Sequence, residues 1–318
     1  MPRRDRAALL PWVGVGVSVL CVGAVIWWAA RQPAPRLPTK PAEIGWLVLS
    51  ISLYALATLI RGERWRLLIA DQGGSMSRAD SVGLMVVGYM GNNVLPARGG
   101  DLFRVILGAP RAAVGRRSIL GTLLAERLLD IVVLAVIFVV LAITIAGGAG
   151  LPSGDSLRWL LIAAAAALTA LALTFVVLAR RGLIRRARKF LAPMFASTFA
   201  LRGAHGAVML ALTLAVWLIE AGVWGTAGAA AGFEMNGPEA MYMVALASMF
   251  ALIPSGPGYA GTQDAAAVIG AKAIGATSQT AVSYLVLVRF VLLVPITLAG
   301  LLLVAVRYGG LRRVFRRG

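Results

Sequence analysis

The sequence predicts an all-α integral membrane protein made of two inverted halves, with about six spanning helices and two re-entrant helical hairpins. Of the 318 residues, 59% are hydrophobic and 14% are charged, and the mean hydropathy is +0.84. A soluble domain exposes far more polar surface than this composition allows. Apolar runs of about 20 residues, the length that crosses a bilayer, recur along the chain. Two apolar stretches, one in each half, are interrupted at similar Pro-Gly breaks.

The apolar segments define the expected elements. They lie at 8–30, 43–60, 79–96, 119–146, 157–179, 206–231, 240–253, 259–275 and 280–306. The first segment follows Arg3, Arg4 and Arg6, as a signal peptide would. Its length and the pair Trp27-Trp28, typical of a membrane interface, favour an uncleaved anchor over a cleaved signal.

The basic loops set the orientation, because cytoplasmic loops of membrane proteins carry an excess of Lys and Arg. Loops 61–78 and 97–117 are both rich in arginine, although the apolar segment 79–96 lies between them. A single span cannot leave both of its ends on one side. We therefore expect 79–96 to enter from the cytoplasm, turn and leave the same way.

The same conflict recurs in the second half. Loop 180–203 and the tail 307–317 are basic, whereas loops 147–156 and 232–239 contain no Lys or Arg. The number of membrane crossings agrees with these charges if the broken stretch 240–275 is a second re-entrant hairpin that enters from the outer face. Both termini are then cytoplasmic, in a bacterial-type inner membrane.

The whole chain, residues 1–318, is expected to form a single transmembrane domain. The half-repeats are about 8–146 and 157–306, joined through an outer loop, and the basic cytoplasmic loop 180–203 lies within the second half. Each half reads span, span, hairpin, span. Matching interrupted segments in two halves predict a transport site at the repeat interface. The alternative is that both breaks are external loops between ordinary spans.

The breaks themselves are expected to gate this site. Backbone that leaves the helix at membrane depth must be buried in protein or face water, because lipid cannot satisfy its N–H and C=O groups. Half-helix N-termini at such breaks suit an anionic headgroup. The expected gating residues are Pro96, Gly99, Gly100, Pro254, Gly256, Pro257 and Gly258.

Charged and polar residues inside apolar segments are the expected substrate site, since such residues are costly in a membrane unless paired or hydrated. Glu126 and Asp130 share one helix face. We expect Arg289 to pair with one of these two or with Glu220. The alternative is an ion pair that only fixes helix packing. The expected substrate-binding residues are Arg98, Glu126, Arg127, Asp130, Asp264, Arg289, Asn92, Asn93 and Gln263.

Two further polar features carry alternatives. Asn92, Asn93 and Gln263 are explained equally by hydrogen bonds to backbone freed at the breaks. Segment 61–66, with Trp65, is predicted to be an interfacial belt that holds lipid phosphates.

Composition excludes several other classes of site. The single Cys21 allows no disulfide framework or zinc site, and the lone His205 is expected to be an interfacial residue. We expect no metal and no cofactor. The net charge of +18 resides in loops between apolar runs, so anionic membrane lipids, and not nucleic acid, are the expected partners.

Four motifs carry a resemblance to a known family. They are RGERWRLLI at 61–69, GNNVLPARGGDLFR at 91–104, ERLLD at 126–130 and IPSGPGYAGTQDA at 253–265. In this order, and with Arg289 in the last span, the chain resembles the flippase-like transmembrane region of lysylphosphatidylglycerol synthases and its stand-alone relatives. The resemblance implies movement of aminoacylated or glycan-linked lipids between leaflets. The aminoacylating domain of the full synthases is expected to be absent, because this chain stops at Gly318.

The leading expectation is therefore a lipid flippase and not an enzyme. Arg98, Arg127 and Arg289 would engage a phosphate through guanidinium contacts. Glu126, Asp130 and Asp264 would balance charge or bind a cationic headgroup. Transport would be passive or ion-coupled, because no nucleotide-binding loop is present. Two alternatives stay open: an accessory subunit that presents lipid to a separate transferase, and a membrane-embedded lipid-modifying enzyme.

Overall fold

The computed structural model describes residues 30–95, 99–146, 203–251 and 256–308, together with Gly23, Ile26 and Trp27. Several predicted features lie outside the described residues: most of segment 8–30, segment 157–179, the loops 147–156 and 180–202, the tail beyond Tyr308, and Pro96, Arg98 and Pro254.

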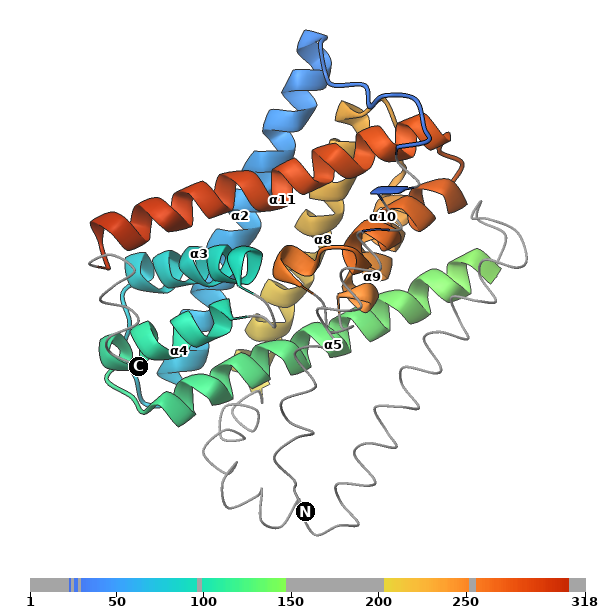
Figure 1. Ribbon diagram of the computed structural model, residues 1–318. Helices are drawn as coiled ribbons and strands as arrows, with labels where there is room; N and C mark the ends of the chain where they lie inside the picture. Colours follow the sequence, from blue (N-terminus) through green and yellow to red (C-terminus); the bar gives the residue numbers. More distant parts are fainter. Residues whose placement is uncertain are drawn as a thin grey trace, which may run out of the picture.

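The described residues form helices joined by short connections, with no strand among them (Figure 1). The helices are α2 (Pro41–Ala70), α3 (Arg78–Val94), α4 (Gly100–Ala112), α5 (Arg116–Ala146), α8 (Gly203–Ala230), α9 (Gly237–Phe250), the short 3₁₀ helix η1 (Pro257–Tyr259), α10 (Thr262–Ala273) and α11 (Ser278–Val306). The all-α prediction is confirmed for this part of the chain.

Three of the described helices are long and apolar enough to cross a membrane. They lie at Pro41–Ala70, His205–Ala230 and Ser278–Val306, with hydropathies of 1.8, 2.0 and 2.5. At 1.5 Å per residue, each is longer than the roughly 30 Å of bilayer hydrocarbon. The chain is a helical membrane protein.

Helix α2 corrects the predicted boundary of the second segment. The predicted segment ends at residue 60, but the helix continues to Ala70, so 61–66 is neither a loop nor an interfacial belt. Within it, Trp65 is completely buried and the Arg64 side chain is 1% exposed. Counting charge alone misplaced this segment, because Arg61 and Arg64 are neutralised by carboxylates of other helices and Arg66 by Glu63 of the same helix.

Segment 79–96 does not turn within itself as predicted, because Arg78–Val94 is one continuous helix, α3. The interruption follows it, and α3 and α4 are two short helices that pack against each other (Figure 1). Glycine permits the close approach, since a Cβ on Gly91 would lie 2.6 Å from the Cα of Gly100. Arg104, predicted to lie in a basic loop, is a buried residue of α4.

The second predicted break is also a helix interruption. Helix α9 ends at Phe250 and α10 begins at Thr262, and the two helices pack against each other. Asn236 and Glu239 form a capping box at the start of α9, in which each side chain accepts the other residue's backbone N–H at 2.8–2.9 Å. Helices α3, α4, α9 and α10 have 12 to 17 residues, so each alone is too short to cross a bilayer.

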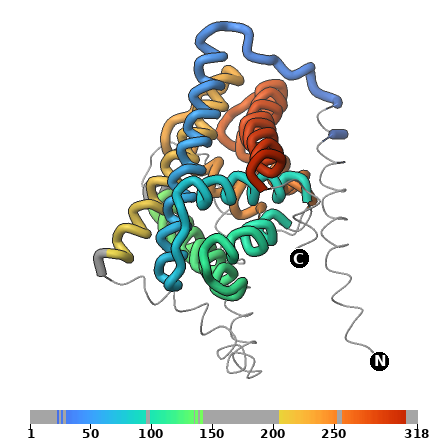
Figure 2. Tube along the Cα trace, turned by 90° about the vertical axis from the view of Figure 1, so that its left-hand side faces the viewer, coloured from blue at the N-terminus to red at the C-terminus, as the bar shows by residue number. Residues whose placement is uncertain are grey.

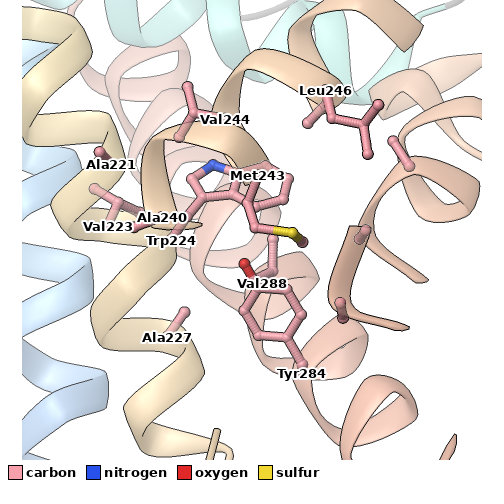
Figure 3. Packing of buried hydrophobic residues seen from close by; sticks show 14 of the residues in the cluster. Ala221, Val223, Trp224, Ala227, Ala240, Met243, Val244, Leu246, Tyr284 and Val288 are labelled. Carbon is pink, nitrogen blue, oxygen red and sulfur yellow. The ribbon is translucent and has the colours of Figure 1, made fainter. Parts of the chain in front are cut away.

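Three apolar cores hold the described helices together, and two of them are large. In the first, Trp224 of α8, Met243 of α9 and Tyr284 of α11 interlock, with the two ring centroids 6.3 Å apart (Figure 3). The second is centred on Trp65 and Leu84 and joins α2 to helices α3 and α4, the first helix pair. Helices α9 and α10 are the second pair. Helices α2 and α8 run side by side through the molecule (Figure 2).

Candidate functional site

The cores leave a polar cavity of about 290 Å³ where the helices of both halves meet. Its wall includes Asn92 and Asn93 near the end of α3 and Gly258, Tyr259 and Gln263 near the start of α10. The remaining wall comes from α2, α4, α5, α8, α9 and α11. Its charged residues are Arg61, Arg64, Arg104, Arg127, Glu126, Asp130 and Glu220.

Arg61 and Glu220 link α2 to α8 across one side of the cavity. Nη1 of Arg61 lies 2.6 Å from Oε1 of Glu220, and both residues are buried. The Arg61 guanidinium also lies 5.9 Å from the centroid of the Tyr89 ring. A charge-assisted hydrogen bond of this length, away from water, fixes both side chains.

Arg64 joins α2 to α5. It donates to both carboxylate oxygens of Asp130, at 2.7 and 3.4 Å, and to the Thr213 hydroxyl at 2.9 Å. One Glu126 oxygen lies 3.6 Å from the same guanidinium. This forked contact is the geometry for which arginine is suited and lysine is not.

Arg104 connects the first helix pair to α5. Its Nη2 lies 2.5 Å from Oε2 of Glu126, and the guanidinium stacks 4.3 Å from the centroid of the Trp65 ring. Room for its aliphatic stem depends on glycine, because a Cβ on Gly88 would come within 2.8 Å of the Arg104 Cδ. Helix α4 is thereby tied to both α5 and α2.

Arg127 is the least compensated cation of the cavity wall. Among the described residues its one carboxylate contact is Asp101, with Nη2 and Oδ2 3.6 Å apart, which is beyond hydrogen-bond distance. Its side chain is 36% exposed. The guanidinium therefore keeps donor capacity that the protein does not use.

Arg289 contradicts the expected pairing. It binds not Glu126, Asp130 or Glu220 but the carboxylate of Asp264, and it also donates to the carbonyl of Gly258 at 2.5 Å. The reason is distance along the fold, since α11 packs against α10, which carries Asp264. Neither Arg289 nor Asp264 belongs to the cavity wall, so both support the turn beside it.

That turn has unusual backbone geometry. Gly258, Tyr259 and Gly261 have φ of +61°, +55° and +85°. The left-handed conformation costs a residue with a Cβ roughly 1–2 kcal/mol, so Tyr259 must be held by its surroundings. Arg289 supplies that hold, donating to the Tyr259 carbonyl at 3.3 Å. The glycine of the predicted break at 258 fits this requirement.

Asn92 serves both of the roles considered from sequence, whereas Asn93 lines the cavity and bonds a side chain of α11. Asn92 accepts the backbone N–H of Gly100 at 3.0 Å, so it satisfies the first turn of α4, whose preceding residue is Gly99. Asn93 donates to the Thr297 hydroxyl at 3.0 Å. Both also line the cavity, together with Gln263. At the second break, Gly256 precedes η1 and Pro257 begins it.

Sequence reasoning missed three wall residues, Arg61, Arg64 and Arg104, as well as the aromatic side chains beside them. A signal for two of them exists, because residues three apart on a helix share a face. Extending the helix past residue 60 would have placed Arg61 and Arg64 together. The aromatic members of the wall are Tyr54, Tyr89, Trp217, Trp224 and Tyr259.

The remaining candidates lie away from the cavity. His205 contacts Asp71 at 2.9 Å near the end of α2. Among the described residues, no group of three or more His, Cys, Asp or Glu side chains is arranged to hold a metal ion.

The fold and the cavity define a class: a helical membrane protein with a polar, arginine-rich cavity enclosed by its helices. The chain belongs to the family described as the lysylphosphatidylglycerol synthase TM region, which matches residues 12–300. This membership confirms the resemblance carried by the four motifs and indicates a lipid-related function in a membrane. The chain matches no curated protein and no solved structure.

Proposed function

We propose that the protein moves a membrane lipid between the two leaflets, with the headgroup passing through the polar cavity. The observation that carries this proposal is the arginine-rich cavity between the two pairs of short helices. Its volume of about 290 Å³ is at the lower end of small-molecule sites, which suits a headgroup whose acyl chains stay in lipid.

The helix contacts support an internal repeat, which the charges of the connections would orient as an inverted one. If α2, α3, α4 and α5 correspond to α8, α9, α10 and α11, each packing partner in one half has its counterpart in the other. Thus α3 packs on α2 as α9 packs on α8, and α3 contacts α11 as α9 contacts α5. Helices α2 and α8 pack on each other, as elements beside a two-fold axis do. The cavity lies where such an axis predicts a transport site.

The short helix pairs support two re-entrant hairpins that meet at the cavity. Residues from the break-facing ends of α3 and α10 both line it, so these helix ends border the cavity, as helix ends at membrane depth require. We also propose that the membrane is a bacterial inner membrane and that both termini are cytoplasmic. Guanidinium groups would bind the lipid phosphate, the hairpins would gate each side in turn, and no covalent chemistry is required.

Reconstitution tests this function. Proteoliposomes that contain acyl-labelled phosphatidylglycerol are treated with an impermeant quencher, which removes signal from the outer leaflet alone. We expect exchange that empty liposomes lack, and a loss of at least tenfold in Arg104→Gln, because this change leaves Glu126 without its closest cation. Arg78→Gln, whose side chain is 81% exposed, is the matched control. No exchange above empty liposomes with any of several phospholipids would refute the proposal.

The family description favours one second candidate, an accessory subunit that presents lipid to a separate transferase. Such a subunit retains lipid during purification and co-purifies with its enzyme, but it does not exchange lipid between leaflets. The same liposome assay therefore distinguishes the two functions.

A further inference from the structure

Three side chains of the cavity wall carry a buried donor that has no hydrogen-bond partner in the described part of the chain. The Nε atoms of Arg64 and Arg104 are buried and have no hydrogen-bond partner among the described residues, and the same holds for the indole N–H of Trp217. These side chains are at least nine-tenths buried, with exposed fractions of 1%, 3% and 9%. Buried polar groups are nearly always paired in folded proteins. All three unpaired atoms are donors, and protein covers them, so a ligand acceptor would reach them only after a side chain moves.

The carboxylates of the wall are in the opposite state, because each is already bound by a guanidinium. Glu220 is held by Arg61 at 2.6 Å, and Glu126 is held by Arg104 at 2.5 Å. Arg64 donates to both carboxylate oxygens of Asp130, at 2.7 and 3.4 Å. A ligand ammonium group would meet carboxylates whose charge an arginine already balances, so it would gain little attraction from them.

Arg127 adds to this contrast between spare donors and paired carboxylates. It lines the cavity, is partly open to solvent, and lies 3.6 Å from Asp101, too far for a hydrogen bond. Its guanidinium can donate to the unbridged oxygens of any phosphodiester, and its positive charge repels an ammonium group on the same headgroup, so it favours a headgroup without an amine.

We propose that the cavity selects an anionic phosphodiester headgroup without an amine, and that Arg127 is the residue that determines this specificity. The inference rests on the proposed lipid transport and names the class of substrate. It makes phosphatidylglycerol-like lipids the substrate and disfavours lipids whose headgroup carries an ammonium.

The test compares three acyl-labelled lipids in separate proteoliposomes: phosphatidylglycerol, phosphatidylethanolamine and lysylphosphatidylglycerol. We expect the wild-type protein to exchange phosphatidylglycerol about tenfold faster than either aminated lipid, the difference that one charge-assisted hydrogen bond makes. Equal exchange of all three lipids, or faster exchange of an aminated one, would overturn the inference while the transport function stands. Absence of exchange for all three would instead refute the transport function.

Arg127→Gln assigns the residue. We expect it to slow phosphatidylglycerol about tenfold and to leave phosphatidylethanolamine within about twofold, so that the preference disappears. Arg78→Gln, with an exposed guanidinium outside the cavity, is expected to keep the preference. Native mass spectrometry of lipids retained after gentle purification gives a second readout, in which the variant loses phosphatidylglycerol relative to phosphatidylethanolamine. An unchanged preference in Arg127→Gln by both measurements would remove this residue from the proposal.

Discussion

Buried arginines in a membrane protein must be neutralised where they stand. Arg61 and Glu220 lie 2.6 Å apart and are 159 positions apart in sequence, so their contact couples the two central helices. Removing one member of a buried pair leaves an uncompensated charge, whereas replacing both members by neutral side chains leaves none. The pair is therefore expected to respond to single and double substitution in different ways.

We predict that Glu220→Gln lowers the free energy of unfolding by about 3 kcal/mol, because it leaves Arg61 buried without its anion. Adding Arg61→Met should restore most of this loss. Thermal unfolding in detergent measures both variants, and Glu234→Gln in an exposed connection is the control. A double variant no more stable than the single one would show that the charge is not the cause.

The same residues show how far sequence reasoning reaches at this scale. Glu126, Arg127 and Asp130 were predicted as site residues because charges inside an apolar run stand out, and all three line the cavity. Arg61 and Arg64 follow the apolar run and read as a loop. Their partners come from α8 and α5, so no local pattern reveals that they are buried.

At the scale of elements, the two helix pairs are held differently. The first pair is tied at both ends: Arg104 binds Glu126 at the cavity, and Asp80 at the start of α3 binds Arg307 at 3.0 Å. The break of the second pair is held by Arg289, which binds Asp264 and the carbonyls of the turn. The turn of the second pair therefore depends on one side chain, that of Arg289.

We predict that Asp264→Asn loosens the second pair, since a neutral amide binds Arg289 less strongly than a carboxylate does. The measurement is the labelling rate of a cysteine placed at Gln263, in the cavity wall, with Cys21→Ser as background. We expect labelling to rise about tenfold, as about 1.4 kcal/mol of lost restraint implies. Lys272→Gln, an exposed change on the same helix, should leave the rate unchanged. An unaltered rate in Asp264→Asn would mean that Arg289 does not hold the pair closed.

Elements were easier to predict than their contacts. Both breaks follow from a local pattern in which Pro and Gly occur together. A lone proline does not suffice, since Pro110 lies within α4 and Pro295 within α11. The partner of Arg289 does not, since several carboxylates were available and only the packing of α11 on α10 selects Asp264. The last turns of α2 were not predicted for the same reason, because their helical structure depends on tertiary pairing.

At the scale of the whole molecule, the two halves should have opposite orientations in the membrane. The correspondence of helix contacts is a property of packing and says nothing of the side from which each pair enters. Charge supplies that direction, because Arg66 and Arg78 flank the connection before α3, while Glu234 and Glu239 flank the connection before α9.

We therefore predict that cysteines placed at Ser75 and Gly237, both exposed, react from opposite sides of the membrane. In a Cys21→Ser background, an impermeant maleimide added to intact cells should label the Gly237→Cys variant and spare the Ser75→Cys variant. Permeabilised cells should label both, which controls for reactivity. If the first pair made an ordinary single crossing, the number of crossings between these two positions would change by one. Both cysteines would then react from the same side, and an inverted repeat with one hairpin from each face could not hold.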